Sequence, residues 1–142
     1  MDRHASAHWA GGLKDGKGTV SSESGVLDAR PYNFGQRFEN EPGTNPEELI
    51  GAAHASCFSM ALSLVLGESG YTPDEVDTQA RVTIRESDDG FEIPAIHLDV
   101  TATVPGADDA AFQQAAEGAK AGCPVSKLFN AEITLNATLQ NG

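Results

Sequence analysis

The sequence predicts an α+β fold, in which strands and helices occupy separate blocks of the chain. Three observations support this: short strands with glycine-rich turns at the start, a long helix with a strong start signal in the middle, and alternating strands with further helices after it. The resulting order of strands, helix, strands, helices and strand is typical of α+β proteins. The 142 residues contain no internal repeat, linker or low-complexity tract, so we expect a single domain over residues 1–142.

The first third of the chain predicts short strands joined by turns. Apolar residues alternate with polar ones over residues 5–9, and Gly-Gly and Asp-Gly pairs follow. Further short strands are expected at Thr19-Val20 and Val26-Leu27. The segment from Tyr32 to Phe38 is rich in aromatic residues, and we expect it to be irregular.

The clearest signal is the start of a helix at residue 46. Asn45 is a favourable N-cap, Pro46 suits the first helical position, and Glu48 stands three residues after the cap. Glu47 and Glu48 also place negative charge at the positive end of the helix dipole. The helix is predicted to run to about residue 66 and to end at the glycine at position 67 or 70.

This helix is apolar enough to suggest a membrane span, because residues 49–66 carry no formal charge. The stretch is nevertheless rich in Ala, Ser and Gly, and a helix that is apolar on every face also suits the centre of a soluble protein. The N-terminus lacks the pattern of a signal peptide. A soluble, cytoplasmic protein with no membrane partner is therefore expected.

The second half predicts a hairpin, two helices and a last strand. Residues 76–84 alternate strictly, residues 87–90 (Ser-Asp-Asp-Gly) form a turn, and residues 96–102 make the returning strand. Asp108 or Asp109 caps a helix that ends near Gly122. Cys123-Pro124 opens a short helical segment, and residues 133–139 alternate as the final strand.

The net charge of −12 excludes one class of partner. Nine basic against 21 acidic side chains, with no basic cluster, repel a phosphate backbone, so no nucleic-acid partner is expected.

The chain has two cysteines, Cys57 and Cys123, separated by 66 positions. Neither has a second cysteine at zinc-ligand spacing, so we expect no metal site. Cys57 lies in the middle of the apolar helix, where burial raises a thiol pKa, whereas Cys123 precedes Pro124 near an N-cap position, where a thiolate is favoured. The residues alone leave two packed thiols and a redox pair equally open, because free cysteine often packs as a small hydrophobe.

A nucleophilic Cys57 needs a positive partner, and Arg37 is the best candidate, although the residues alone also describe a surface arginine. Glu47 stands ten residues before Cys57, about 15 Å along a helix axis, so it reaches that thiol only through a helix break or across a dimer. Glu48 points away from Cys57 and is better explained by capping. His54 is either a base or a packing residue, and we favour packing because no acidic residue stands beside it.

Five stretches carry a resemblance to a known family: residues 7–9, 16–20, 23–27, 43–66 and 121–126. The run GTNPEELIGAAHASCFSMAL, residues 43–62, is highly specific. Over nearly its whole length the chain resembles the OsmC/Ohr family of thiol peroxidases, and the OsmC branch more than the organic-hydroperoxide-resistance branch. The resemblance implies an intertwined α+β homodimer with antiparallel strands around a long buried central helix.

The resemblance also implies an activity and its residues. Cys57 falls on the peroxidatic cysteine and Cys123 on the resolving one, while Arg37 and Glu47 fall on the family's paired site residues. The implied function is reduction of organic hydroperoxides through a Cys57 sulfenic acid that Cys123 closes to a disulfide, with an external dithiol, such as a lipoyl-type donor, as the reductant and without a cofactor.

Apolar residues around the site favour alkyl or lipid hydroperoxides as substrates; they are Phe58, Met60, Tyr32, Phe34 and Phe38. A rival hypothesis is a non-catalytic dimer that binds an apolar ligand or senses oxidants through the same thiols. A weaker third hypothesis is a metal-binding protein that uses His54 with the cysteines.

Overall fold

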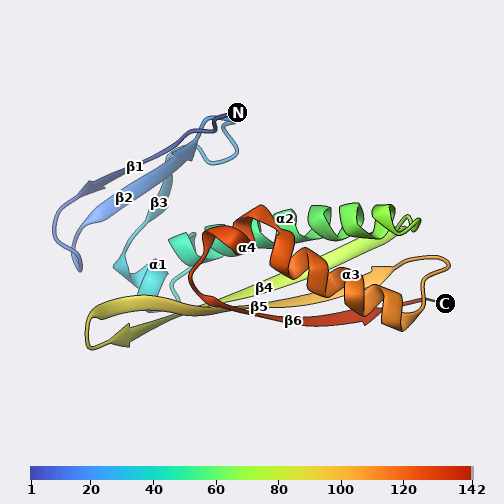
Figure 1. Ribbon diagram of the computed structural model, residues 1–142. Helices are drawn as coiled ribbons and strands as arrows, with labels where there is room; N and C mark the ends of the chain where they lie inside the picture. The colour runs from blue at the N-terminus through green and yellow to red at the C-terminus, as the bar shows by residue number, and fades with distance from the viewer. Residues whose placement is uncertain (142) are drawn as a thin grey trace. The chain divides into compact units, whose positions relative to one another are not determined.

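The computed structural model describes residues 1–141 and divides the chain into two compact units, Met1–Leu49 and Ile50–Gly142 (Figure 1). Each unit contains its own three-stranded sheet. The long helix α2 (Pro46–Glu68) begins in the first unit and runs through the second.

The first unit is an antiparallel sheet in the order β1-β2-β3, formed by β1 (Ala5–Ala10), β2 (Lys17–Ser22) and β3 (Arg30–Tyr32). Gly18 of β2 pairs with Trp9 on one side and Tyr32 on the other. The two rings lie 5.4 Å apart between centroids, and a Cβ added at Gly18 would stand 2.6 Å from the Trp9 ring and 2.7 Å from the Tyr32 ring. Glycine at position 18 therefore lets the aromatic pair close over the sheet.

Two predictions for this unit were wrong. Val26 and Leu27 form no strand; they belong to a turn in which Ser22 N–H donates to the Leu27 carbonyl over 2.9 Å, and the third strand is β3. The segment expected to be irregular contains a short helix, α1 (Phe34–Phe38). Its cause is Asn33, whose side chain accepts from the Gln36 N–H over 2.9 Å and so caps the helix.

The predicted start of α2 is confirmed. Glu48 N–H donates to the side-chain oxygen of Asn45 over 2.8 Å, as an N-cap requires. At the other end Gly70 has φ +87°, and Tyr71 N–H donates to the Leu66 carbonyl over 2.9 Å. This pattern is a Schellman motif, so Gly70 rather than Gly67 ends the helix.

The second unit contains the sheet β4-β5-β6, formed by β4 (Glu75–Ser87), β5 (Gly90–Thr103) and β6 (Glu132–Leu139). β4 and β5 form the predicted antiparallel hairpin, in which Ser87 pairs with Gly90. β6 instead runs parallel to β5, which corrects the expectation of antiparallel strands throughout. The reason is the connection: α3 (Asp109–Gly122) and α4 (Pro124–Leu128) carry the chain back along the sheet before β6 starts.

The core of the second unit lies between one face of this sheet and helices α2 and α3 (Figure 1). Asp108 caps α3 by accepting from the Ala111 N–H over 2.8 Å. The fully buried side chains come from all three elements: Phe58, Leu62 and Leu66 of α2, Ile96, Leu98 and Val100 of β5, and Phe112 and Ala116 of α3.

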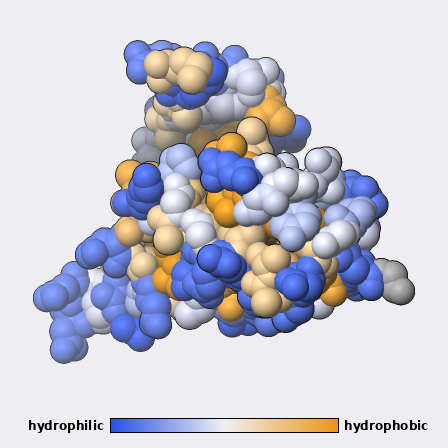
Figure 2. Space-filling model, turned by 45° about the vertical axis from the view of Figure 1, so that its right-hand side comes forward, coloured by the Kyte–Doolittle hydropathy of each residue, from blue (hydrophilic) through white to orange (hydrophobic). Residues whose placement is uncertain are grey.

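In the single chain α2 is buried along one side only. Phe58 and Leu62 face the core, but Met60 is 76% exposed and Leu64 is 65% exposed. Hydrophilic residues cover much of the molecular face seen in Figure 2, with hydrophobic residues in smaller patches among them. Among the described residues, α2 alone is long and apolar enough to cross a membrane, a test that core helices of soluble proteins also pass.

Candidate functional site

Two elements bring the cysteines together within the second unit. Cys57 lies on α2, and Cys123 lies at the junction between α3 and α4. Cys123 N–H donates to the Ala119 carbonyl over 2.9 Å, and the Cys123 carbonyl accepts from the Lys127 N–H over 3.1 Å. One residue therefore ends α3 and begins α4, which fixes the direction of its side chain. The two sulfurs lie 2.8 Å apart.

Both thiols are free, and their surroundings differ. Cys57 is half-buried, whereas Cys123 is fully buried. A disulfide bond is about 2.05 Å long, so oxidation requires the sulfurs to approach by only about 0.8 Å. The two sulfurs are thus close enough to form a disulfide.

The pKa values of the two thiols shift in opposite directions. Burial raises the pKa of Cys57, and hydrogen bonding to Cys123 raises it further. Burial also acts to raise the pKa of Cys123, but hydrogen bonds from Cys57 and from the backbone and side chain of Ser126 outweigh it and lower that pKa. In the single chain, therefore, Cys123 is the thiol whose thiolate is favoured, and Cys57 needs a further positive charge to become a good nucleophile.

A second polar contact lies beside the sulfurs. His54, one turn before Cys57 on α2, is fully buried, and its Nε2 is 2.7 Å from the Ser126 hydroxyl. Burial lowers the pKa of His54, so the imidazole is neutral at physiological pH. The sequence analysis did not single out Ser126, although it stands three residues after Cys123, the spacing of a capping-box partner.

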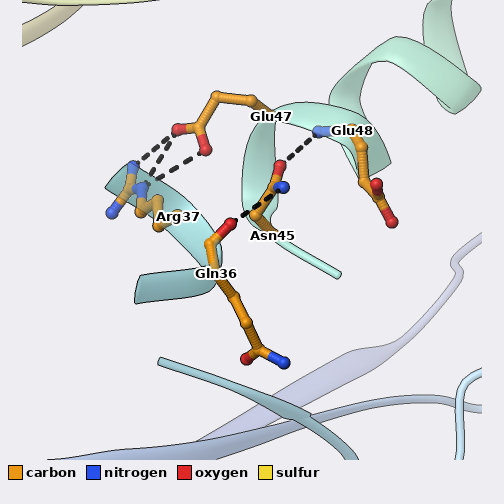
Figure 3. A network of polar contacts seen from close by, with 5 residues as sticks. All are labelled: Gln36, Arg37, Asn45, Glu47 and Glu48. Atoms are coloured by element: carbon orange, nitrogen blue, oxygen red, sulfur yellow. Dashed lines mark hydrogen bonds and ion pairs between the residues drawn. The ribbon is translucent and has the colours of Figure 1, made fainter. Parts of the chain in front are cut away.

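In the first unit the structure pairs Arg37 with Glu47 (Figure 3). Arg37 Nη2 donates to Glu47 Oε1 over 2.8 Å, and Arg37 Nε lies 3.1 and 3.3 Å from the two carboxylate oxygens. The Glu47 side chain is only 8% exposed, while that of Arg37 is 35% exposed. Arg37 Nη1 makes none of these three bonds, so the guanidinium is held rigidly with one nitrogen free of the carboxylate.

The end of α1 and the start of α2 create this ion pair. Arg37 lies in the last turn of α1, and Glu47 lies in the first turn of α2. Asn45 bridges the two helices, because its side chain caps α2 and also donates to the Gln36 carbonyl over 3.3 Å (Figure 3). The Glu48 side chain points away from this pair in Figure 3.

The helix α2 is continuous from Glu47 to Cys57. The helix has no break between Glu47 and Cys57, so these ten residues span about 15 Å of helix axis.

A concavity opens beside Arg37 within the first unit. Its volume is about 260 Å³, and it is lined by Trp9, Leu13, Tyr32, Asn33, Phe34, Arg37 and Phe38. Three of the aromatic residues expected near the substrate line it. Phe58, a fourth, is instead 0% exposed in the core and is unavailable to a ligand.

The hypothesis of a metal site finds no support in the part of the chain that the structure describes. There, no group of three or more His, Cys, Asp or Glu side chains is arranged to hold a metal ion.

Comparison with known proteins identifies the family. A model of the OsmC-like protein family matches residues 38–138. The chain is 57% identical over 141 residues to peroxiredoxin OsmC of Escherichia coli, with 99% of each chain covered. It is 31% identical over 124 residues to organic hydroperoxide resistance protein OhrB of Bacillus subtilis, covering 87% of this chain and 89% of that protein.

A solved structure shares the fold of this chain. The fold matches an organic hydroperoxide resistance protein from Elizabethkingia anophelis with a TM-score of 0.69 and 28% identity, over 100% of this chain and 99% of that one. The family match, the close relative and the shared fold together show that this chain belongs to the OsmC-like protein family.

Proposed function

We propose that the protein is a cysteine-based peroxidase that reduces organic hydroperoxides to alcohols. The observation that carries this proposal is the 2.8 Å separation of the Cys57 and Cys123 sulfurs, one half-buried and one fully buried. The names of the relatives, a peroxiredoxin and organic hydroperoxide resistance proteins, support the same activity.

In the proposed cycle the Cys57 thiolate attacks the outer oxygen of the hydroperoxide. The O–O bond breaks, Cys57 becomes a sulfenic acid, and the alkoxide leaves and takes a proton to become the alcohol. Cys123 then attacks the Cys57 sulfur, an S–S bond forms, and the hydroxyl group leaves as water. An external dithiol reduces the disulfide and returns both thiols, and a lipoyl-type donor has the required chemistry.

Arg37 and Glu47 complete the site from a second subunit in this proposal. Burial raises the pKa of Cys57, so the nucleophile requires a cation, and an arginine fork also orients the peroxide oxygens. Glu47 holds Arg37 in place through its buried carboxylate, and Nη1 remains available to the substrate. The unbroken helix between Glu47 and Cys57 supports delivery by a partner rather than by the same chain.

The exposed side of α2 supports a homodimer. Met60 and Leu64 are 76% and 65% exposed and lie on the same helix as Cys57. A second copy that packs against this apolar side would bury these residues and bring its own Arg37-Glu47 pair to the site. Without a partner the apolar side of α2 would face water.

The aromatic concavity beside Arg37 supports an apolar substrate. Its lining offers Trp9, Tyr32, Phe34 and Phe38 to an alkyl or lipid chain, and Arg37 belongs to the same lining and can bind the peroxide group. Two reactive free thiols also suit a reducing compartment, and we infer a cytoplasmic location on that ground.

The test is peroxide consumption with excess dithiothreitol by the wild type and two variants. Cys57→Ser is expected to abolish turnover, whereas Cys123→Ser is expected to complete one turnover and then stop. Cumene hydroperoxide should react faster than hydrogen peroxide. Multiple turnovers by Cys57→Ser would contradict the proposal.

The same assay separates an enzyme from a sensor. A sensor oxidises once per molecule and then waits, even when dithiol is abundant, so the consumption trace would end after one equivalent of peroxide. An enzyme continues until the peroxide is exhausted.

A further inference from the structure

The polar contacts around Cys123 extend beyond the two sulfurs to a buried histidine. His54 Nε2 is 2.7 Å from the Ser126 hydroxyl, and the Ser126 side chain is hydrogen-bonded to the Cys123 sulfur. His54 and Cys123 are both fully buried, and Ser126 is 6% exposed. The three residues come from α2, the α3–α4 junction and α4, so the tertiary fold creates this chain of contacts.

The directions of these hydrogen bonds follow from the number of available protons. Ser126 has one hydroxyl proton, and only by donating it to Cys123 does it stabilise a thiolate. The hydroxyl oxygen must then accept from His54, which requires the proton of the neutral imidazole to be on Nε2.

The other ring nitrogen supports the same assignment. His54 Nδ1 is buried and has no hydrogen-bond partner within the described residues. With the proton on Nε2, Nδ1 carries only a lone pair; with the proton on Nδ1, a buried N–H donor would be left unpaired, which native proteins avoid more strictly. The Phe129 ring meets the imidazole edge-on, at 5.5 Å between centroids, and restrains its orientation.

We propose that His54 and Ser126 form a hydrogen-bond relay to the Cys123 sulfur that stabilises it as it attacks the sulfenic acid at Cys57. This inference rests on the proposed function and concerns its second step. Ser126 contacts the reacting sulfur directly, whereas His54 is a positioning residue that acts through Ser126.

The relay keeps its own protons throughout the step. The Cys123 sulfur supplies the electron pair of the new S–S bond, and the S–O bond of the sulfenic acid breaks. The hydroxide that leaves combines with the proton that Cys123 has given up, so the products are the disulfide and one water molecule. Ser126 contributes only its hydrogen bond, which lowers the energy of the attacking thiolate.

The first consequence of the relay is a lowered pKa of Cys123, which thiolate absorbance at about 240 nm measures. In a Cys57→Ala background Cys123 is the only cysteine, so the absorbance against pH gives its pKa alone. Ser126→Ala should raise this pKa by about one unit, which is about tenfold less thiolate at any pH below it. His54→Leu should raise it less, and His54→Gln, which keeps an N–H near the position of Nε2, should restore the value of the parent.

Ser59→Ala is the matched control. Ser59 also lies on the inner part of α2, but its hydroxyl bonds to the Ala55 carbonyl over 2.8 Å and to the Thr78 hydroxyl over 2.7 Å. Loss of this hydroxyl should leave the pKa of Cys123 unchanged. An equal shift in Ser59→Ala, or no shift in both Ser126→Ala and His54→Leu, would overturn the relay.

A kinetic measurement in the two-cysteine protein tests the second step. After one equivalent of cumene hydroperoxide, Ser126→Ala should accumulate about tenfold more Cys57 sulfenic acid than the wild type, trapped with dimedone. Equal trapping in variant and wild type would refute the relay while leaving the peroxidase intact. Failure of the wild type to consume peroxide would instead refute the proposed function, and the absorbance measurement would still test the relay.

Discussion

The charge of the Arg37-Glu47 pair leads to a quantitative prediction for the pKa of Cys57. A guanidinium about 4 Å from the sulfur stabilises the thiolate by about 4 kcal/mol at an effective dielectric near 20. The Glu47 oxygen lies 2.8 Å from Arg37 Nη2, on the far side of the guanidinium in the proposed site. At about 6.8 Å from the sulfur it opposes the thiolate by about 2.4 kcal/mol, so the pair contributes only about 1.7 kcal/mol.

The two single variants should therefore shift the pKa of Cys57 in opposite directions. Arg37→Met removes the whole attraction and should raise it by up to about three units, whereas Glu47→Gln removes the repulsion and should lower it by up to about two units. The double variant should raise it by about one unit, which is the net effect of the pair. These are upper figures, because water reaches the Arg37 side chain, which is 35% exposed.

A Cys123→Ala background leaves Cys57 as the single cysteine, so its thiolate absorbance against pH gives each value directly. The rate of peroxide reduction should fall in Glu47→Gln although the thiolate is more abundant, because Arg37 is no longer held in line. A rise in the pKa of Cys57 in Glu47→Gln, or no change in Arg37→Met, would refute a site in which this ion pair faces the sulfur.

Three further predictions follow from the same structure. Leu64→Lys should convert the proposed dimer to a folded monomer in sedimentation, whereas Thr138→Lys on the opposite side of the sheet should not; a dimeric Leu64→Lys protein would count against α2 as the interface. Gly70→Ala should cost about 1–2 kcal/mol in thermal unfolding because φ is +87°, while Gly122→Ala, where no atom lies within 4 Å of the new Cβ, should be neutral or stabilising. Burial lowers the folded-state pKa of His54, so the wild type should lose stability relative to His54→Leu as the pH falls below about 6.5, and equal acid profiles in urea would contradict this.

The parts of the fold that local sequence determines were predicted well. Asn45 and Pro46 specify the start of α2 by their own chemistry, and the turn between β4 and β5 follows from four consecutive residues. The α1 helix was missed because its signal is a single cap, Asn33, before only five helical residues. A segment of that length has too little periodicity to be recognised.

The missed features depend on contacts between distant residues. The parallel course of β6 depends on how α3 and α4 pack, and alternation along a strand is the same in parallel and antiparallel pairs. The contact between His54 and Ser126 joins positions 72 apart, so His54 had no visible partner in the sequence. The sequence motifs did indicate Cys57 and Cys123 individually, but their separation of 2.8 Å required the fold.

The position of Cys123 between two helices affects how well the protein resists inactivation by excess hydroperoxide. A sulfenic acid that meets a second hydroperoxide is converted to a sulfinic acid, which ordinary thiols do not reverse. Because Cys123 is anchored at the end of α3 and the start of α4, its sulfur is already beside Cys57 and needs no local unfolding to arrive. Disulfide formation should therefore be faster than oxidation of the Cys57 sulfenic acid to a sulfinic acid. The protein should then stay active when hydroperoxide is in large excess.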